Sequence, residues 1–113
     1  IGMGFSKSIF EEEESWSDNL NLSNIVDERL GNIVSRGDIG TGLFFSNVNY
    51  LNGLYYLRGK YKMQEDEISI GIRLMIDHKS IEEKKIIGEN VDDLADKITD
   101  WALQVIKELD NKD

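Results

Sequence analysis

Two stretches of strict alternation between apolar and polar residues lie side by side in the middle of the chain. Every second residue from 55 to 63 is apolar or glycine, and every second residue from 68 to 76 is isoleucine or leucine. Alternation with a period of two is typical of half-buried β-strands. The chain therefore predicts a β-hairpin with strands at 55–63 and 68–76, joined by the polar loop 64–67.

The register of this hairpin follows from its apolar faces, because a slip of one residue would turn every isoleucine toward water. Matching the two faces places Met63 opposite Ile68 and, at the far end, Tyr55 opposite Ile76. Gly59 interrupts the packed face, so we expect a bulky group above it or a bend in the strand.

The other face of the hairpin gathers basic side chains. They are Arg58, Lys60, Lys62 and Arg73. Arg58 is directly opposite Arg73, and like charges at that spacing repel each other. We expect an anionic group to relieve this repulsion: an acidic segment of this chain, a neighbouring subunit or a partner. RNA would need several stacking aromatics on this face, and the register places only Tyr56 there, so we expect no nucleic acid.

Two segments have the apolar spacing of amphipathic helices. Apolar residues recur at helical spacing from about residue 20 to 36, and again from 91 to 109. Asn90 is the predicted cap of the second helix. Three acidic residues in its first turns complement the helix dipole, and they are Asp92, Asp93 and Asp96.

Two further strands complete the predicted sheet. A turn at 77–80 leads to a third antiparallel strand at 84–88, and the apolar run 1–5 is another candidate. The sequence thus predicts a single α+β domain over residues 1–113. In it, two helices pack on one face of a three- to four-stranded antiparallel sheet.

The remaining segments predict connections. Four adjacent carboxylates at 11–14 indicate a solvated loop, because a calcium loop would place its acids at alternate positions. The glycine-rich segment 37–42 follows a helix, unlike a phosphate-binding loop. The segment 43–50 is largely apolar, and if Phe44 and Phe45 point to opposite sides, one of them is a further candidate contact for a partner.

Composition excludes several classes of function. The formal net charge of −9 disfavours nucleic acid and anionic membrane as partners. No run of 18 apolar residues exists, so we expect no insertion of this segment into a bilayer. The chain has no cysteine, and its one histidine, His78, has no evident nucleophile or second ligand near it. We therefore predict no catalytic residue, no metal site and no cofactor.

The order of elements resembles the small α+β domain shared by the TolB amino-terminal domain and CsgG-like envelope assembly proteins. The motif Tyr-x-Leu-x-Gly stands at 55–59, a Leu-Ile-Asp-like segment at 74–77, and the acidic start of the last helix at 88–94, continuing as Asp-Lys-Ile at 96–98. The resemblance covers about residues 50–109. It implies a non-enzymatic accessory domain of a bacterial envelope that works through protein contacts.

These observations lead to one main functional hypothesis. We expect a protein-interaction or assembly module, periplasmic or otherwise in the cell envelope, that binds a protein partner or itself through the open sheet face. The alternative is a small acidic dimer like a secretion chaperone, with the cytoplasm as the alternative compartment. A stable dimer with an apolar groove would favour the chaperone, and a hydrolase or metal enzyme using His78 is a third hypothesis. Because the chain opens with Ile1, we expect a processed or truncated piece of a longer protein.

Overall fold

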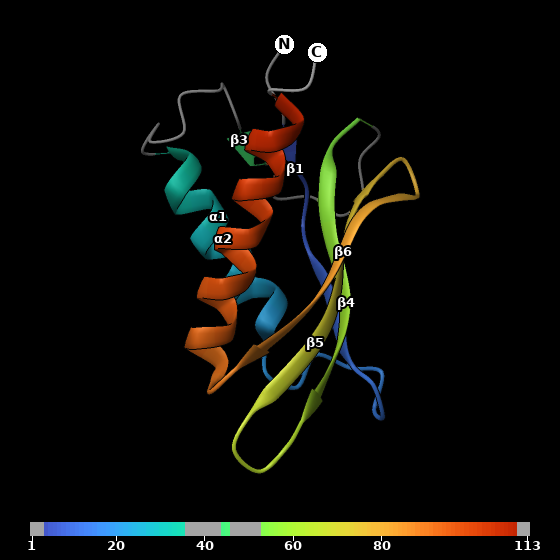
Figure 1. The fold of residues 1–113 in the computed structure, drawn as a ribbon, viewed down its shortest axis with the longest axis vertical. Helices are drawn as coiled ribbons and strands as arrows, with labels where there is room; N and C mark the ends of the chain where they lie inside the picture. The colour runs from blue at the N-terminus through green and yellow to red at the C-terminus, as the bar shows by residue number, and fades with distance from the viewer. Residues whose placement is uncertain (1–3, 36–43, 46–52, 111–113) are drawn as a thin grey trace.

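A computed structural model describes residues 4–35, 44–45 and 53–110. Within these residues two helices pack on one face of a mixed β-sheet (Figure 1). In chain order the elements are β1 (Gly4–Phe5), β2 (Ile9–Glu12), α1 (Leu22–Ser35), β3 (Phe44–Phe45), β4 (Tyr55–Met63), β5 (Ile68–Ile76), β6 (Lys79–Gly88) and α2 (Val91–Asp110). The predicted α+β class, with both helices against the sheet, is confirmed.

The central hairpin of β4 and β5 has the predicted bounds and register. Met63 is opposite Ile68 and Tyr55 is opposite Ile76, with every intervening pair in step. At Gly59 an added Cβ would lie 2.8 Å from the carbonyl oxygen of Gly71 and 3.2 Å from the nearest atom of the Ile70 side chain. The glycine is therefore needed because the neighbouring strand already fills this space.

The third strand is longer than predicted. Strand β6 begins at Lys79, and only Asp77 and His78 form the turn, with φ values of 49° and 66°. Two successive left-handed residues make the tight hairpin turn whose twist matches that of the flanking strands. The prediction of a four-residue turn was wrong, because this turn lacks the usual glycine and the strand after it is charged rather than alternating.

The N-terminal half contains the largest departure from the predicted fold. Strand β2 runs parallel to β4, with Phe10 opposite Gly59 and Glu11 opposite Lys60. The prediction that residues 11–14 form only a loop was therefore wrong for Glu11 and Glu12, and the sheet is mixed rather than purely antiparallel. Parallel neighbours need a crossover connection, and α1 lies on the connection between these two strands.

Helix α1 is held at its start by a carboxylate outside the helix. The oxygens of Asp18 accept hydrogen bonds from the backbone N–H groups of Leu22 and Ser23, at 2.9 and 2.8 Å. The buried Tyr61 hydroxyl donates to Asp18 Oδ1 at 2.9 Å and accepts from Leu20 N at 3.1 Å. Burial, with Asp18 adding to it, raises the pKa of Tyr61 to about 12. One strand thus fixes where the helix begins.

Helix α2 begins as predicted. The side chain of Asn90 accepts a hydrogen bond from the N–H of Asp93 at 2.9 Å. Gly88, just before it, has no room for a side chain, since an added Cβ would lie 2.7 Å from backbone atoms of Leu94. This close approach seats the first turn of the helix on the end of β6.

The acidic residues at the start of α2 have a structural partner. Arg29 of α1 forms ion pairs of 3.2 Å with both Asp92 and Asp96. Arg29 therefore bridges the two helices along their exposed edge, in addition to the predicted dipole effect.

The core lies between the two helices and the inner face of the sheet. The apolar faces predicted for β4 and β5 and the apolar side of α2 meet there, together with Phe5 and Phe10 from the N-terminal strands. The fully buried large side chains are Tyr61, Phe5, Phe10, Leu22, Leu30, Leu57, Ile70, Ile72, Leu74, Leu94, Ile98 and Ile106.

One ionisable group lies close to this core. Asp27 of α1 is 8% exposed and accepts the backbone N–H of Ser8 at 3.0 and 3.2 Å. Burial raises the pKa of Asp27, and the hydrogen bonds from Ser8 act in the opposite direction. This contact joins α1 to the connection between β1 and β2.

Candidate functional site

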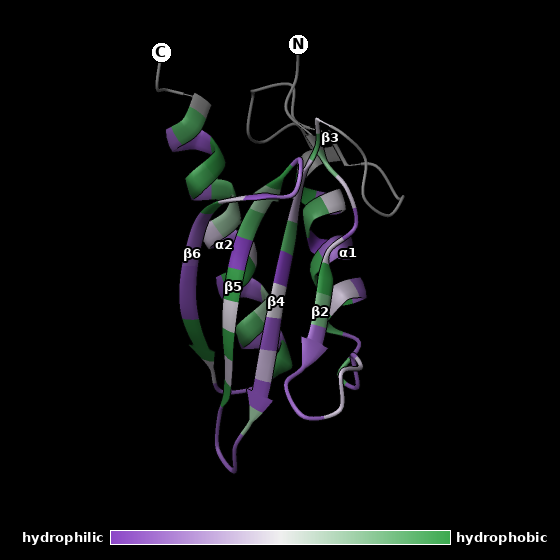
Figure 2. Ribbon diagram, turned by 90° about the vertical axis from the view of Figure 1, so that its right-hand side faces the viewer, coloured by the Kyte–Doolittle hydropathy of each residue, from purple (hydrophilic) through white to green (hydrophobic). Residues whose placement is uncertain are grey.

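The face of the sheet opposite the helices is open along most of its length. Figure 2 looks onto this face, with β6, β5, β4 and β2 side by side and the helices behind them. Five exposed basic side chains stand on it and form what we call the cationic face: Arg58, Lys60, Lys62, Arg73 and Lys85. The four predicted from the sequence are therefore brought together, and Lys85 joins them from β6.

Arg58 and Arg73 are direct neighbours across β4 and β5, as predicted. Glu83 of β6 continues the same row, and its carboxylate lies 3.5 Å from Nε of Arg73. Arg58 forms no ion pair within the described ranges, and its neighbour on β2 is Ile9, which is 36% exposed. An acidic residue of the same chain therefore relieves the repulsion on one side only.

The next row across the sheet has a glycine at its centre. Gly71 lies between Lys60 of β4 and Lys85 of β6, and Glu11 of β2 ends the row. A Cβ added at Gly71 would meet no atom within 4 Å. Gly71 is thus the floor of an open depression of about 720 Å³, whose walls include Lys60, Lys85 and Arg73.

Trp16 stands beside this depression and was not singled out by the sequence analysis. Its side chain is 66% exposed, and the ring centroid lies 3.5 Å from Nζ of Lys60. Its φ of 58° is unusual for a bulky residue, and its backbone N–H donates to the carbonyl of Glu12 at 3.0 Å. No sequence pattern points to Trp16, because it is an isolated aromatic residue in a polar segment. Only the structure shows its contact with Lys60.

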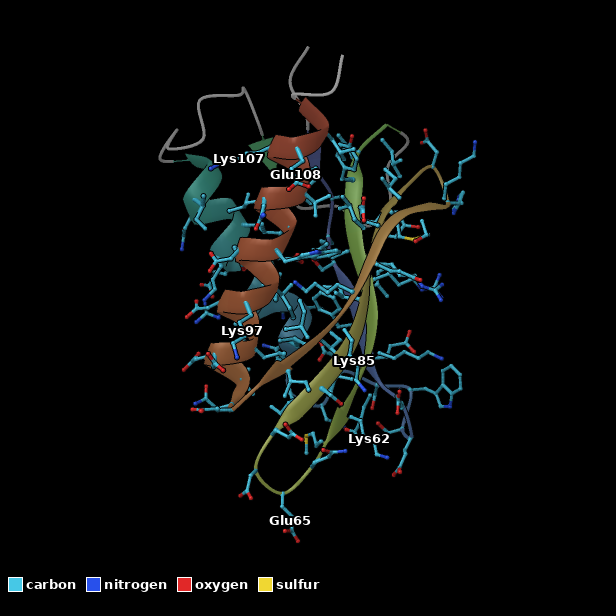
Figure 3. All side chains as sticks on the ribbon, viewed as in Figure 1. Lys62, Glu65, Lys85, Lys97, Lys107 and Glu108 are labelled. Atoms are coloured by element: carbon cyan, nitrogen blue, oxygen red, sulfur yellow. The ribbon has the colours of Figure 1, made fainter. Side chains whose placement is uncertain are left out.

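The last row of the face combines a basic and an apolar residue. Lys62 is opposite Ser69, and Ser69 is opposite Ile87, which is 46% exposed. Figure 3 shows Lys62 and Lys85 on the strands, whereas Lys97 and Lys107 lie on α2.

The other sequence candidates have different outcomes. Phe44 and Phe45 form strand β3, which pairs in parallel with β1, but their side chains and residues 46–50 lie outside what the structure describes. Tyr56 is on the open side by register and is only 3% exposed. The register prediction for Tyr56 is therefore correct, but its side chain is buried on that side of the sheet.

Residues 4–35, 44–45 and 53–110 contain no group of three His, Asp or Glu side chains suited to a metal ion. No helix in the same ranges combines the length and apolar character needed to span a membrane. His78 lies exposed in the turn between β5 and β6.

Comparison with known proteins adds little to this geometry. No family model and no curated protein matches the chain. One solved structure, described as the crystal structure of an uncharacterized protein, is similar with 8% sequence identity and a TM-score of 0.37. The alignment covers 96% of this chain and 86% of that one. A similarity at this level supports no argument about function, so the resemblance to TolB and CsgG-like domains stays a prediction.

Proposed function

We propose that the chain is a non-enzymatic protein-interaction module that binds an acidic segment of a protein partner on its cationic face. The observation that carries this proposal is the contrast between the face and the whole molecule. The face concentrates five basic side chains on a chain whose formal net charge is −9. A local basic surface on an acidic protein selects acidic partners and accelerates their approach.

The chemistry around the depression supports a peptide or protein ligand. Exposed Trp16, Ile9 and Ile87 border the basic side chains, and binding surfaces are enriched in aromatic residues and arginine. Gly71 leaves room for a ligand atom to approach the backbone of β5. An acidic chain lying along β5 would contact Arg73, Lys60 and Lys85 together.

The cell-envelope location implied by the family resemblance belongs to the same proposal, with the cytoplasm as its alternative. Fractionation of the source cells, followed by detection of the chain with an antibody, tests the compartment directly.

Site-specific photo-crosslinking tests the binding surface. A photoreactive residue at Ser69, between Lys62 and Ile87 in the last row of the cationic face, should capture a discrete second protein in the source cells. A photoreactive residue at Gln104, exposed on α2, is the control and should not capture it. If both positions capture the same protein, or neither does, the cationic face is not the binding surface.

Two substitutions sharpen this experiment. Gly71→Val adds a branched side chain to the floor of the depression, where its Cβ would meet no atom within 4 Å, so it should abolish crosslinking while the chain stays folded. Lys60→Glu reverses one charge of the face, and Lys107→Glu makes the same change on α2. Loss with the first charge reversal and retention with the second is the expected result.

A further inference from the structure

Strand β6 is an edge of the sheet. Its hydrogen-bonded neighbour among the described residues is β5 alone, and it stands at the left margin of the sheet in Figure 2. An edge strand presents unpaired N–H and C=O groups that can pair with another chain.

The hydrogen-bond alternation identifies the outward groups of β6. The backbone N–H of Gln64 donates to the carbonyl of Glu67 at 2.8 Å, which closes the hairpin of β4 and β5. Gln64 and Glu67 thus form a hydrogen-bonded pair, and such pairs alternate along an antiparallel ladder, so the odd-numbered residues of β5 bond to β4. The even-numbered residues of β5 therefore bond to β6. Opposite them are the even-numbered residues 82–88 of β6. The backbone groups of Glu83 and Lys85 therefore point outward.

One side chain marks the end of this free edge. Nζ of Lys97, from α2, donates to the carbonyl of Ile87 at 2.9 Å. That bond agrees with the alternation, since it requires the carbonyl of Ile87 to be accessible, and it occupies the edge at this point. The free stretch is centred on residues 82–85.

The charges on this stretch complement their own reverse order. Residues 82–84 read Glu-Glu-Lys, so an antiparallel copy centred on Glu83 would bring Glu82 near Lys84 on both sides of the axis. We propose that two copies of this chain pair antiparallel through β6, about a two-fold axis that passes through Glu83. A second copy of this chain is thus the occupant that the edge fits.

Symmetry fixes which residues would meet. A two-fold axis perpendicular to the sheet keeps the helices of both copies on the same side, and each contact occurs twice. Centred on Glu83, it places Glu82 opposite Lys84 of the second copy. These are pairs without backbone hydrogen bonds, in which cross-strand side chains come closest.

Two registers are compared, with the two-fold axis at Glu83 or at Lys84, and they differ in the like-charged pair that lies on the axis. Glu83 would face Glu83 of the second copy, but Arg73 lies 3.5 Å from this carboxylate within each copy. Centring the axis on Lys84 instead would oppose two lysines, and Lys84 has no ion pair in the described residues. Like charges directly opposite each other are destabilising, so the axis at Glu83 is favoured.

Sedimentation of the full chain over a concentration series tests this dimer. Glu82→Lys and Lys84→Glu each turn both predicted ion pairs into repulsive pairs, so each alone should raise the dimer dissociation constant at least about tenfold. Neither side chain makes an ion pair or hydrogen bond in the described residues, so both variants should stay folded. Lys107→Glu and Glu108→Lys on α2 are the matched controls and should remain dimeric.

Mixing the two variants gives the decisive result. In an equimolar mixture of Glu82→Lys and Lys84→Glu, the lysine introduced at position 82 of one copy faces the glutamate introduced at position 84 of the other. The native Lys84 of the first copy faces the native Glu82 of the second, so both pairs are again oppositely charged and dimers should reappear. A monomeric native chain, a dimer that persists in both single variants, or a mixture that stays monomeric would overturn the proposal.

This dimer and the proposed partner binding can fail separately. Both variants keep the five basic side chains of the cationic face, so crosslinking from Ser69 should survive in them. The dimer interface is charged, unlike the apolar groove of the chaperone hypothesis.

Discussion

The two faces of the same strands differ in what determines their residues. On β4, Leu57 and Tyr61 point into the core and are fully buried, whereas their neighbours Arg58 and Lys60 point to the open face. Packing constrains the first pair through volume and hydrogen bonding. The second pair is free of these constraints, so the open face can carry binding chemistry at little cost to stability. Substitutions on the two faces should therefore have very different effects.

The largest expected difference comes from truncating one side chain on each face. Ile72→Ala removes a side chain that is 1% exposed and should lower the free energy of unfolding by about 2–5 kcal/mol, because a cavity is left in the core. Lys62→Ala on the open face is the control and should change it by less than about 0.5 kcal/mol. Urea unfolding measures both, and equal effects would contradict the assignment of the faces.

A comparison of two glycines comes next in size. Gly88→Ala would place a Cβ 2.7 Å from the backbone of Leu94, and such overpacking costs about 1–3 kcal/mol. Gly71→Ala enters open space and should leave stability unchanged or raise it by about 0.5 kcal/mol, since alanine has less freedom to lose on folding. Thermal unfolding of both variants measures the contrast, and a destabilised Gly71→Ala would show that the open face is packed.

Removing one hydroxyl tests how β4 holds the start of α1. Tyr61→Phe loses the hydrogen bonds to Asp18 and Leu20 and should cost about 1.5 kcal/mol, as expected for a hydrogen bond to a charged group. Tyr55→Phe is the control, since its hydroxyl makes no hydrogen bond within the described residues, and should be nearly neutral. Amide exchange should also quicken in the first turn of α1 in the first variant and not in the second.

The smallest effect concerns pH. The pKa of Asp27 is raised in the folded state above the reference value of 3.8, so the folded state holds its proton more tightly than the unfolded state. The stability that this proton brings is complete below pH 3.8 and is lost as the pH rises through the folded pKa. Asp27→Asn keeps an acceptor for Ser8 and lacks this titration. Relative to this variant, the native chain should lose stability over that pH window and then level off.

The parts of the fold that the sequence predicted are those with strong period-two or helical patterns. The hairpin of β4 and β5 alternates without interruption, so its bounds and register were correct. Helix α2 has both an apolar stripe and a cap at Asn90, and its start was correct. In these segments local propensity and burial agree, so the pattern is sufficient.

The parts that escaped prediction depend on contacts between distant segments. Strand β2 contains two carboxylates, and only its pairing with β4 makes it a strand. The turn at Asp77 and His78 relies on left-handed backbone at two residues without glycine. Within the candidate site, the basic residues of β4 and β5 followed from register, whereas the position of Trp16 over Lys60 depends on how a loop folds back onto the sheet.

The parallel pairing of β2 with β4 also determines the order in which the chain can assemble. Ribosomes add about 5–20 residues per second and release the N-terminal end first. Residues 9–12 therefore emerge seconds before residues 58–61, with which they pair. Strands β4, β5 and β6 each pair with a strand next to them in the sequence. Strand β2 cannot pair until β4 has been synthesised. A strand that is synthesised early is thus one of the last to be held in place.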